Sequence, residues 1–331
     1  MKAKKQILAV AGAAAIVASL GAAPALSAEV TLRGASCFPI GSPTGKPFEL
    51  YVKEVNKAGK GVVQIKMIGG APAIGSPFTM VKKMAKGVHD VVGCTEGYFG
   101  NVLFEVAALR FSEYTYAELR KNGGLDYLQK RLATKNVHYI ARYHSFGPFY
   151  LFLSKKAKIS KPDLKGLHIR VSPIYVAFFT SLGATVQRSN YPQVYTYMEN
   201  GTVQGFGWPA LGWNPSWAKV TKYRVEPGFY DAPLHAVVNL KKWKSLTAAQ
   251  QDVLTQVGLR RERASETSAP AFRALLAKQK AKTAKQGLSA ITFTGADRAK
   301  WLSAAREAGW AQVLKRSPKH GAKLKKLFTR N

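Results

Sequence analysis

The chain has 331 residues, of which 47% are hydrophobic and 11% aromatic. This length allows two folded domains with ordinary cores, and the composition excludes an intrinsically disordered chain. The formal net charge of +32 favours anionic partners, but it does not choose among nucleic acid, acidic lipid and an acidic solute.

Residues 1–28 have the pattern of a secretory signal peptide. Lys2, Lys4 and Lys5 precede an apolar run, and a small-residue cleavage site follows near Ala28. The run is short, no other long apolar stretch follows, and no cysteine for a lipid anchor stands at the cleavage site. We therefore expect export to a periplasm, with no insertion of the mature chain into the membrane.

The two cysteines, Cys37 and Cys94, lie at the ends of early predicted strands. An oxidising compartment permits one disulfide between them, provided that the two strand ends are neighbours at one sheet edge. A bridge and two buried free thiols both remain open at this point.

The mature chain begins with alternating strands and helices. Strands are predicted over 30–35, 62–68 and 90–94, with helices over 43–57 and 76–86 between them. This βαβαβ order is typical of a parallel sheet with helices on its faces. A helical segment over 113–134 then precedes strands over 137–143 and 149–153, which are separated by a break at 145–148.

The second half continues the pattern. A strand over 167–171 is followed by helices over 174–182 and 192–200 and by a short strand over 202–207, and residues 232–239 form a second strand that crosses between domains. Thr247 and Gln250 fit a capping box opening a long helix, which we expect to run past Lys280 with a kink or break at Pro270.

The C-terminal part is basic and helical. Asp297 is expected to cap a helix, and residues 308–331 contain seven Lys/Arg and no acidic residue. This tail is interpreted as a solvated amphipathic helix or as a footprint for a membrane or partner. Its inward-facing residues would be Leu314, Leu324, Leu327 and Phe328.

Two sheets joined by extended strands and one long helix describe a hinged protein with a cleft between two lobes. The expected boundaries place residues 29–148 and 236–272 in lobe I and residues 149–235 and 273–331 in lobe II.

Arg170 stands at the carboxyl end of a predicted strand, two residues before the helix start at Ser172 and Pro173. Ligands bind at that edge in open α/β sheets, and a guanidinium there suits a carboxylate or phosphate. The alternative is an arginine that pairs with a nearby Asp or Glu.

The sequence contains no pattern that supports catalysis, a metal or a cofactor. Residues 205–210 match a dinucleotide motif only loosely, because Trp208 and Pro209 fill the positions where the backbone must approach the ligand. Walker loops, serine elbows and zinc spacings are missing, and the six histidines are scattered. A nucleic-acid surface does not suit an exported chain.

Aromatic residues collect where cleft loops are expected, a make-up typical of a small-ligand pocket or of core packing. They are Tyr98, Phe99, Phe146, Phe149, Tyr150, Trp208, Trp213 and Trp217.

With these residues in view, the chain resembles the solute-binding proteins of tripartite ATP-independent periplasmic (TRAP) transporters, of the DctP type. The resemblance covers nearly the whole mature chain and is most specific at Leu164–Val171, Leu182–Ala184, Val194–Gly205 and Leu240–Leu254.

It implies an α/β, type II-like periplasmic binding protein fold, with mixed sheets flanked by helices and a long helix spanning both lobes. It also implies a carboxylate held by Arg170, and delivery to a permease of small and large subunits driven by an ion gradient. The alternative is a solute-binding protein of an ATP-driven (ABC) importer.

Two departures from the family pattern bear on the ligand. Trp208 occupies the place of an Asn that helps hold the carboxylate, and Tyr150 aligns with a second Arg. We therefore expect a monocarboxylate with an apolar or aromatic body.

Besides Arg170, the predicted ligand-binding residues are Trp208, Tyr150, Glu96, Tyr98, Phe149 and Phe206. Glu96 is expected either to accept a hydrogen bond from the ligand or to pair with a cleft Lys or Arg.

Overall fold

The computed structural model describes residues 28–330. The predicted signal peptide therefore lies outside the described residues, except for its last residue. Within residues 28–330, no helix is both long enough and apolar enough to span a membrane.

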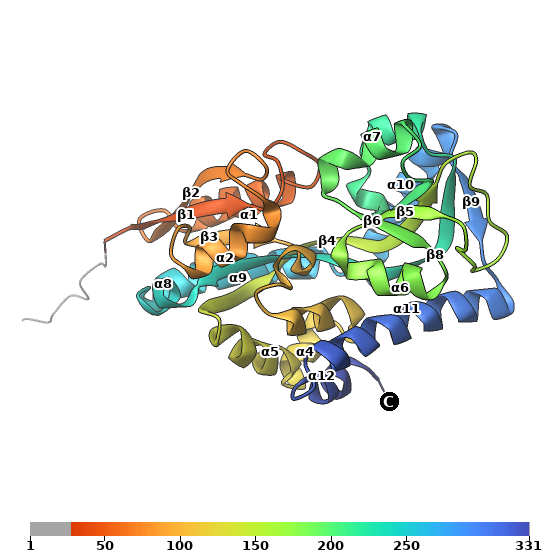
Figure 1. The fold of residues 1–331 in the computed structure, drawn as a ribbon. Coiled ribbons are helices and arrows are strands. Elements are labelled where there is room, and N and C mark those ends of the chain that lie inside the picture. Colours follow the sequence, from red (N-terminus) through yellow and green to blue (C-terminus); the bar gives the residue numbers. More distant parts are fainter. Residues whose placement is uncertain (1–27, 331) are drawn as a thin grey trace, which may run out of the picture.

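Strands of the described chain form one mixed sheet in the order β2-β1-β3-β8-β4-β7-β5-β6, with β9 paired to β8 (Figure 1). Their bounds are β1 Val30–Ser36, β2 Val63–Gly70, β3 Val91–Cys94, β4 Val137–Leu153, β5 His168–Val171, β6 Thr185–Arg188, β7 Gly205–Pro209, β8 Tyr223–Asn239 and β9 Ser289–Thr292. We call the end formed by β2-β1-β3 the first wing and the end formed by β7-β5-β6 the second wing. The two predicted sheets are thus the two ends of one sheet, because β4 and β8 pass through both.

β4 and β8 are 17 residues long each and pair antiparallel from Val137↔Asn239 to Leu153↔Tyr223. The predicted break at 145–148 is wrong, and β8 begins at Tyr223 rather than at residue 232. Repeated register shifts between residues 139 and 151 explain the difference. The bulges accommodate the prolines and Gly147 (φ 72°), which are residues that disfavour a regular strand.

Helices cover both faces of the wings (Figure 1). The α-helices are α1 Lys46–Ala58, α2 Met80–Ala85, α3 Glu96–Phe99, α4 Tyr116–Lys121, α5 Gly124–Ala133, α6 Val176–Ser181, α7 Val194–Glu199, α8 Leu240–Lys244, α9 Ala248–Ala264, α10 Pro270–Lys285, α11 Gly295–Arg316 and α12 Gly321–Phe328. The 3₁₀ helices are η1 Pro77–Thr79, η2 Phe104–Phe111, η3 Pro173–Tyr175, η4 Tyr191–Gln193, η5 Ala210–Gly212 and η6 Pro215–Lys219.

The predicted long helix after Thr247 is two helices. The capping box of Thr247 and Gln250 is present, but α9 ends at Ala264 and Pro270 opens α10 in its first turn. Proline lacks the N–H that would continue α9 and suits a helix start. The helix that contacts both halves is α11, which packs against α6 beside the second wing and against η2.

The C-terminal helices also differ from the prediction. Thr294, not Asp297, is the N-cap of α11, and Asp297 lies in the first turn. The tail breaks after Arg316, and α12 buries Leu324 and Phe328 while Leu314 remains 37% exposed. Inward packing of Leu314 was therefore wrong. α12 contacts α5 and η2.

A disulfide joins Cys37 to Cys94. β1 and β3 are parallel neighbours, with Ser36 opposite Gly93, so the residues that follow lie side by side. The open question of bridge or free thiols is settled in favour of the bridge.

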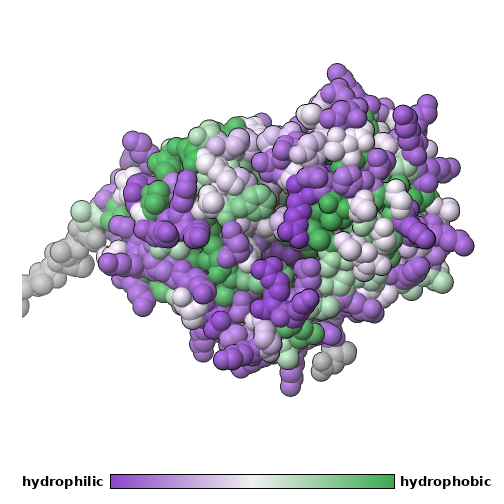
Figure 2. All heavy atoms as spheres, in the orientation of Figure 1, coloured by the Kyte–Doolittle hydropathy of each residue, from purple (hydrophilic) through white to green (hydrophobic). Residues whose placement is uncertain are grey.

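Most of the face in Figure 2 is hydrophilic, and apolar residues show among the polar ones near its middle.

Candidate ligand-binding site

Arg170 is fully buried near the end of β5, in register with Gln187 of β6 and Phe206 of β7. Its Nε donates to Ser189 Oγ at 3.0 Å, its Nη2 donates to the Ser189 carbonyl, and its Nη1 donates to the Tyr175 hydroxyl at 3.2 Å. All three acceptors are neutral. Within the described residues, no carboxylate lies within ion-pair distance of Arg170.

Tyr175 connects Arg170 to β7. Its hydroxyl donates to the Gly207 carbonyl at 2.6 Å while it accepts from Arg170. A Cβ at Gly207 would lie 2.5 Å from the Tyr175 ring, closer than real contacts allow. Glycine at this position therefore lets the Tyr175 ring pack directly against β7, where its hydroxyl contacts the guanidinium.

Trp208 covers Arg170. Its ring centroid lies 5.6 Å from the guanidinium carbon, a cation–π arrangement. Its indole N–H donates to the Gly212 carbonyl at 2.7 Å. Trp208 thus offers a ligand its apolar face and no free hydrogen-bond donor.

A narrow pocket lies beside Trp208, at the carboxyl ends of β3, β5 and β7 and over the middle of β4 and β8. Its cavity volume is only about 40 Å³ in this arrangement, well below the several hundred Å³ of typical small-ligand sites, so the wings must separate before a solute can enter. The wall is mostly apolar and includes Phe146, Phe149 and Trp208. Its polar groups are the hydroxyls of Thr44, Thr95, Tyr98 and Ser172.

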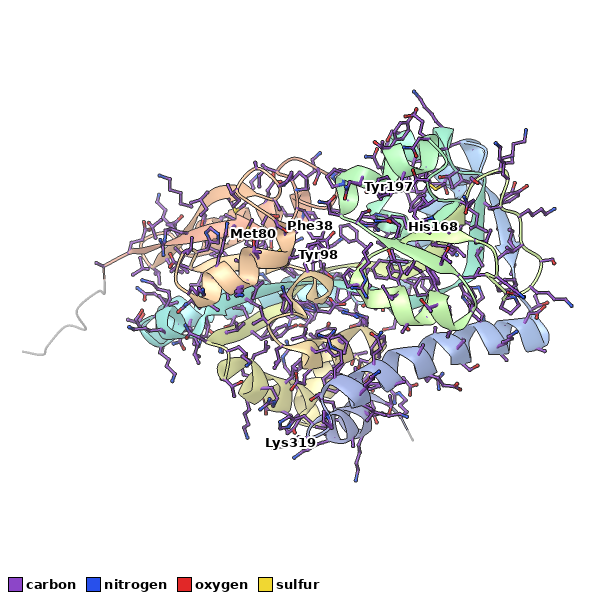
Figure 3. The ribbon with its side chains drawn as sticks, viewed as in Figure 1. Phe38, Met80, Tyr98, His168, Tyr197 and Lys319 are labelled. Atoms are coloured by element: carbon purple, nitrogen blue, oxygen red, sulfur yellow. A yellow bond between two sulfur atoms is a disulfide. The ribbon has the colours of Figure 1, made fainter. Side chains whose placement is uncertain are left out.

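Tyr98 brings the first wing to this pocket. Figure 3 shows Tyr98 and Phe38 at the side of the first wing that faces the second, and their rings lie 5.5 Å apart. Burial raises the pKa of Tyr98 to about 12, although the Arg170 charge opposes the shift. The hydroxyl is therefore neutral at physiological pH and can donate a hydrogen bond.

The two wings touch at Gly97. A Cβ at this position would lie 2.7 Å from Ile174 Cγ2 and 3.5 Å from Ser172 Oγ. Gly97 follows the first wing's β3, whereas Ile174 and Ser172 follow the second wing's β5. The absence of a side chain at Gly97 allows this close approach.

The carboxylate of Glu96 forms its ion pairs and hydrogen bond with neighbouring residues of the protein. Its carboxylate is fully buried, lies 2.8 Å from Arg110 Nε, accepts from Thr95 Oγ1 at 3.0 Å and lies 3.4 Å from His235 Nε2. Burial raises its pKa, but the charges and hydrogen bonds of Arg110 and His235 outweigh that effect and lower the pKa to about 2. Of the two readings of Glu96, this geometry corresponds to the pairing with a cleft arginine.

Two of the predicted residues lie away from the pocket wall. Tyr150 packs near Lys280, whose ammonium lies 4.9 Å from the ring centroid. Phe206 is fully buried between Phe152 and Trp217, with ring centroids 5.4 and 5.0 Å away. The structure therefore brings together Arg170, Trp208, Tyr98 and Phe149, but not Tyr150 or Phe206.

Sequence reasoning missed the polar residues Thr95 and Ser172 of the pocket wall and Ser189, which holds Arg170. Thr95 and Ser172 directly follow predicted strands, so the strand-end argument applied to Arg170 also signals them. Ser189 carries no such signal, because its strand, β6, was not predicted.

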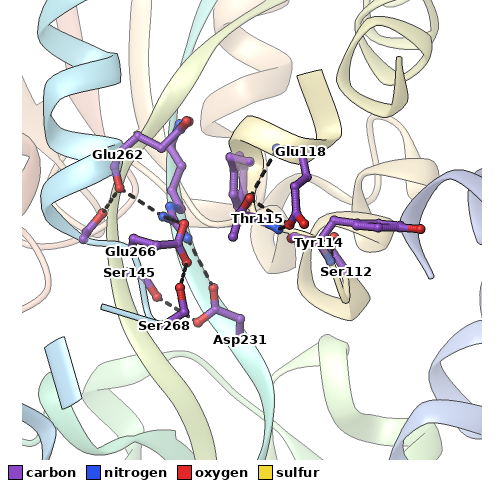
Figure 4. Close-up of polar contacts among 12 residues, drawn as sticks. Ser112, Tyr114, Thr115, Glu118, Ser145, Asp231, Glu262, Glu266 and Ser268 are labelled. Atoms are coloured by element: carbon purple, nitrogen blue, oxygen red, sulfur yellow. Dashed lines mark hydrogen bonds and ion pairs between the residues drawn. The ribbon is translucent and has the colours of Figure 1, made fainter. Parts of the chain in front are cut away.

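Arg142 is a second deeply buried arginine, and its surroundings contrast with those of Arg170. Its Nη2 lies 3.1 Å from Glu266 and its Nη1 3.8 Å from Asp231. Asp231 also accepts from Ser145 at 2.8 Å, within the polar network of Figure 4. Arg142 is thus neutralised by the protein, whereas Arg170 is not.

The family described as bacterial extracellular solute-binding protein, family 7, matches residues 35–315. The chain belongs to this family of periplasmic solute receptors. The predicted TRAP-type resemblance and α/β fold are confirmed, and an ABC-importer protein is not favoured.

Three similar proteins illustrate the match. The chain is 24% identical over 265 residues to a solute-binding protein of Verminephrobacter eiseniae (strain EF01-2), covering 76% of this chain and 78% of that protein. It is 27% identical over 150 residues to a monocarboxylate 2-oxoacid-binding periplasmic protein of Nostoc sp. (strain PCC 7120), covering 43% of this chain and 40% of that protein.

The third is a solved structure, a TRAP periplasmic solute-binding protein of Desulfovibrio salexigens with bound orotic acid. It is 20% identical and has a TM-score of 0.77, covering 90% of this chain and 97% of that chain.

Proposed function

We propose that this TRAP-type receptor captures a monocarboxylate with an apolar or aromatic body in the pocket between its wings. The observation that carries the proposal is the fully buried Arg170, which donates only to neutral groups. Buried charges in proteins are ordinarily paired. A ligand carboxylate would supply the counter-charge and accept two hydrogen bonds from the planar guanidinium.

The pocket wall supports the apolar body. Trp208 and Phe149 present ring surface, while Tyr98 and Ser172 offer single hydroxyls. The only charged residue among those predicted to line the site, apart from Arg170, is Glu96, and it is held by Arg110. A second carboxylate or an ammonium group on the ligand would find no free partner among these residues.

Access to Arg170 requires movement. The guanidinium lies behind the Trp208 ring and does not itself line the pocket. The carboxylate therefore reaches Arg170 when the wings separate, and Trp208 then closes over the bound group.

In this proposal, each lobe is built around one wing of the sheet. β8 residues 233–239 pair with the β4 segment 137–145, and residues 223–229 pair with the β4 segment 149–153, which supports the predicted division near residue 148. Residues 321–328 contact α5 and η2, so we assign α12 to lobe I rather than to lobe II.

Export, delivery and the lack of catalysis complete the proposal. The signal peptide directs the chain to the periplasm, where the loaded receptor docks on a permease of small and large subunits and performs no chemistry. N-terminal sequencing of periplasmic protein should find a start near Glu29. Uptake of the ligand by cells should require both permease subunits and persist without ATPase genes of an importer.

A thermal-shift screen of organic acids tests the ligand class. Aromatic and branched aliphatic monocarboxylates should raise Tm most, and Arg170→Lys should abolish most of the gain because an ammonium cannot make the planar two-point contact. Stabilisation by dicarboxylates or sugar acids alone would contradict the apolar pocket. Unchanged affinity of Arg170→Lys in calorimetry would remove Arg170 from the site.

A further inference from the structure

A second pocket lies next to the ligand pocket and shares Tyr98 and Ile174 with it. Its other walls come from α3 and η2 on one side, from η3 and the end of β6 on the other, and from the last turn of α11. Its cavity volume is about 160 Å³. We call it the side pocket.

Four charged residues line the side pocket, namely Glu96, Arg110, Arg188 and Arg316. Glu96 and Arg110 form a buried ion pair at 2.8 Å and cancel each other. Arg188 and Arg316 have no ion-pair partner among the described residues. Both side chains are exposed to solvent, and they are two positive charges without a carboxylate partner at the rim of one pocket.

Both arginines are placed by the fold. Arg316 lies over the Phe104 ring, with its guanidinium carbon 3.9 Å from the ring centroid, so its planar group is held against η2. Arg188 ends β6, opposite Val171 of β5, and directly precedes the Ser189 that holds Arg170. One cation thus comes from the side of η2 and α11, and the other from the second wing.

We propose that the side pocket is an anion site in which an oxyanion, a carboxylate or phosphate group, bridges Arg188 and Arg316. A shared oxyanion would accept charge-assisted hydrogen bonds from both guanidinium groups, which the protein itself does not pair. The side chain of Gln312, which also lines the pocket, adds a neutral donor. The bound anion connects β6 to η2 and α11 and so favours the arrangement in which the wings touch. This site does not depend on Arg170.

Calorimetric titration of the mature, full-length chain with inorganic phosphate, at constant ionic strength in chloride, tests the proposal. Wild-type protein should bind one phosphate saturably. Arg188→Gln and Arg316→Gln should each weaken binding roughly tenfold, as expected for loss of one charge-assisted contact, and the double variant should show no saturable binding.

The matched control is the double variant Arg260→Gln and Arg298→Gln, which removes the same charge from exposed positions on α9 and α11 that do not line the side pocket. It should bind phosphate like the wild type. Equal losses in both double variants would mean general charge attraction and would overturn the proposal, as would no saturable binding by the wild type. Far-UV circular dichroism and cooperative thermal unfolding like those of the wild type would show that the Arg188 and Arg316 variants are folded.

The oxyanion can be free or part of the transported solute, and competition distinguishes the two sources. Phosphate that binds together with a monocarboxylate indicates a free anion. Phosphate that is displaced by a dicarboxylate, but not by the monocarboxylate, indicates a second acidic group on the solute. Failure of the Arg170→Lys test leaves this result unaffected, so the two proposals fail separately.

Discussion

Replacement of Arg170 by methionine should leave the stability of the ligand-free protein nearly unchanged while it removes ligand binding. Arg170→Met eliminates three hydrogen bonds from a charged donor to neutral acceptors, each worth about 1.5–3 kcal/mol net. It also removes the desolvation penalty of a buried charge that no carboxylate offsets, which is several kcal/mol. The two effects are similar in size and opposite in sign, so the free energy of unfolding should change by no more than about 1 kcal/mol.

Arg142→Met is the matched control, because Arg142 is buried to nearly the same degree but lies near Glu266 and Asp231. Its removal leaves two carboxylates without their partner and should cost about 3 kcal/mol. The two substitutions change the net charge equally, so a clear difference in stability between them would reflect only the surroundings of each guanidinium.

Urea denaturation of ligand-free, disulfide-intact protein measures both variants, with the free energy of unfolding extrapolated to water. Refolding from denaturant first removes any solute carried through purification. If Arg170→Met destabilises the protein as much as Arg142→Met does, the Arg170 guanidinium is a structural anchor and the argument from its unpaired charge is refuted.

Three further predictions use the same protein. The pKa of Glu96 is lowered from 4.5 to about 2 in the folded state, so its ion pair stabilises the fold above pH 4.5 and this contribution is lost as the pH falls towards 2. Glu96→Gln should therefore reduce the loss of stability between pH 4.5 and pH 2. An unchanged loss over this pH range would assign acid unfolding to other groups. Gly97→Ala should weaken solute binding with little change in stability, because the added Cβ separates the wings. Gly100→Ala should leave solute binding unchanged, because the nearest contact of its Cβ is at 3.4 Å. Equal affinities of the two variants in calorimetry would mean that the contact at Gly97 is not needed for binding. Replacement of both Cys37 and Cys94 by serine should lower the free energy of unfolding by about 4 kcal/mol, as expected for a bridge across 57 residues. A much smaller loss in urea denaturation would mean that the unfolded chain without the bridge retains structure in this loop.

Local signals in the sequence were sufficient for most of the first wing. The strands and helices over residues 30–94 follow from alternation and proline-started helices, and they lie within a few residues of their predicted bounds. The strand ending near Arg170 and the capping box at Thr247 were predicted for the same reason, because each depends on contacts between residues close in sequence.

Edges and long pairings were not predictable from local signals. β6 (Thr185–Arg188) and β9 (Ser289–Thr292) are four residues long and largely exposed, so neither shows a clear apolar alternation. β8 contains prolines that argue against a strand, and its pairing with β4 through bulges and with β3 and β9 keeps it extended.

The sequence by itself determined the fold class, the family and the position of Arg170 at the carboxyl end of a strand. Tertiary structure alone decided the electrostatics of the site. Arg110 lies beside Glu96, whereas Arg170 has only neutral acceptors, and the Trp208 indole donates to Gly212. The physical reason is that an ion pair or hydrogen bond depends on distances of about 3 Å between groups, and the pairing of strands distant in sequence sets those distances.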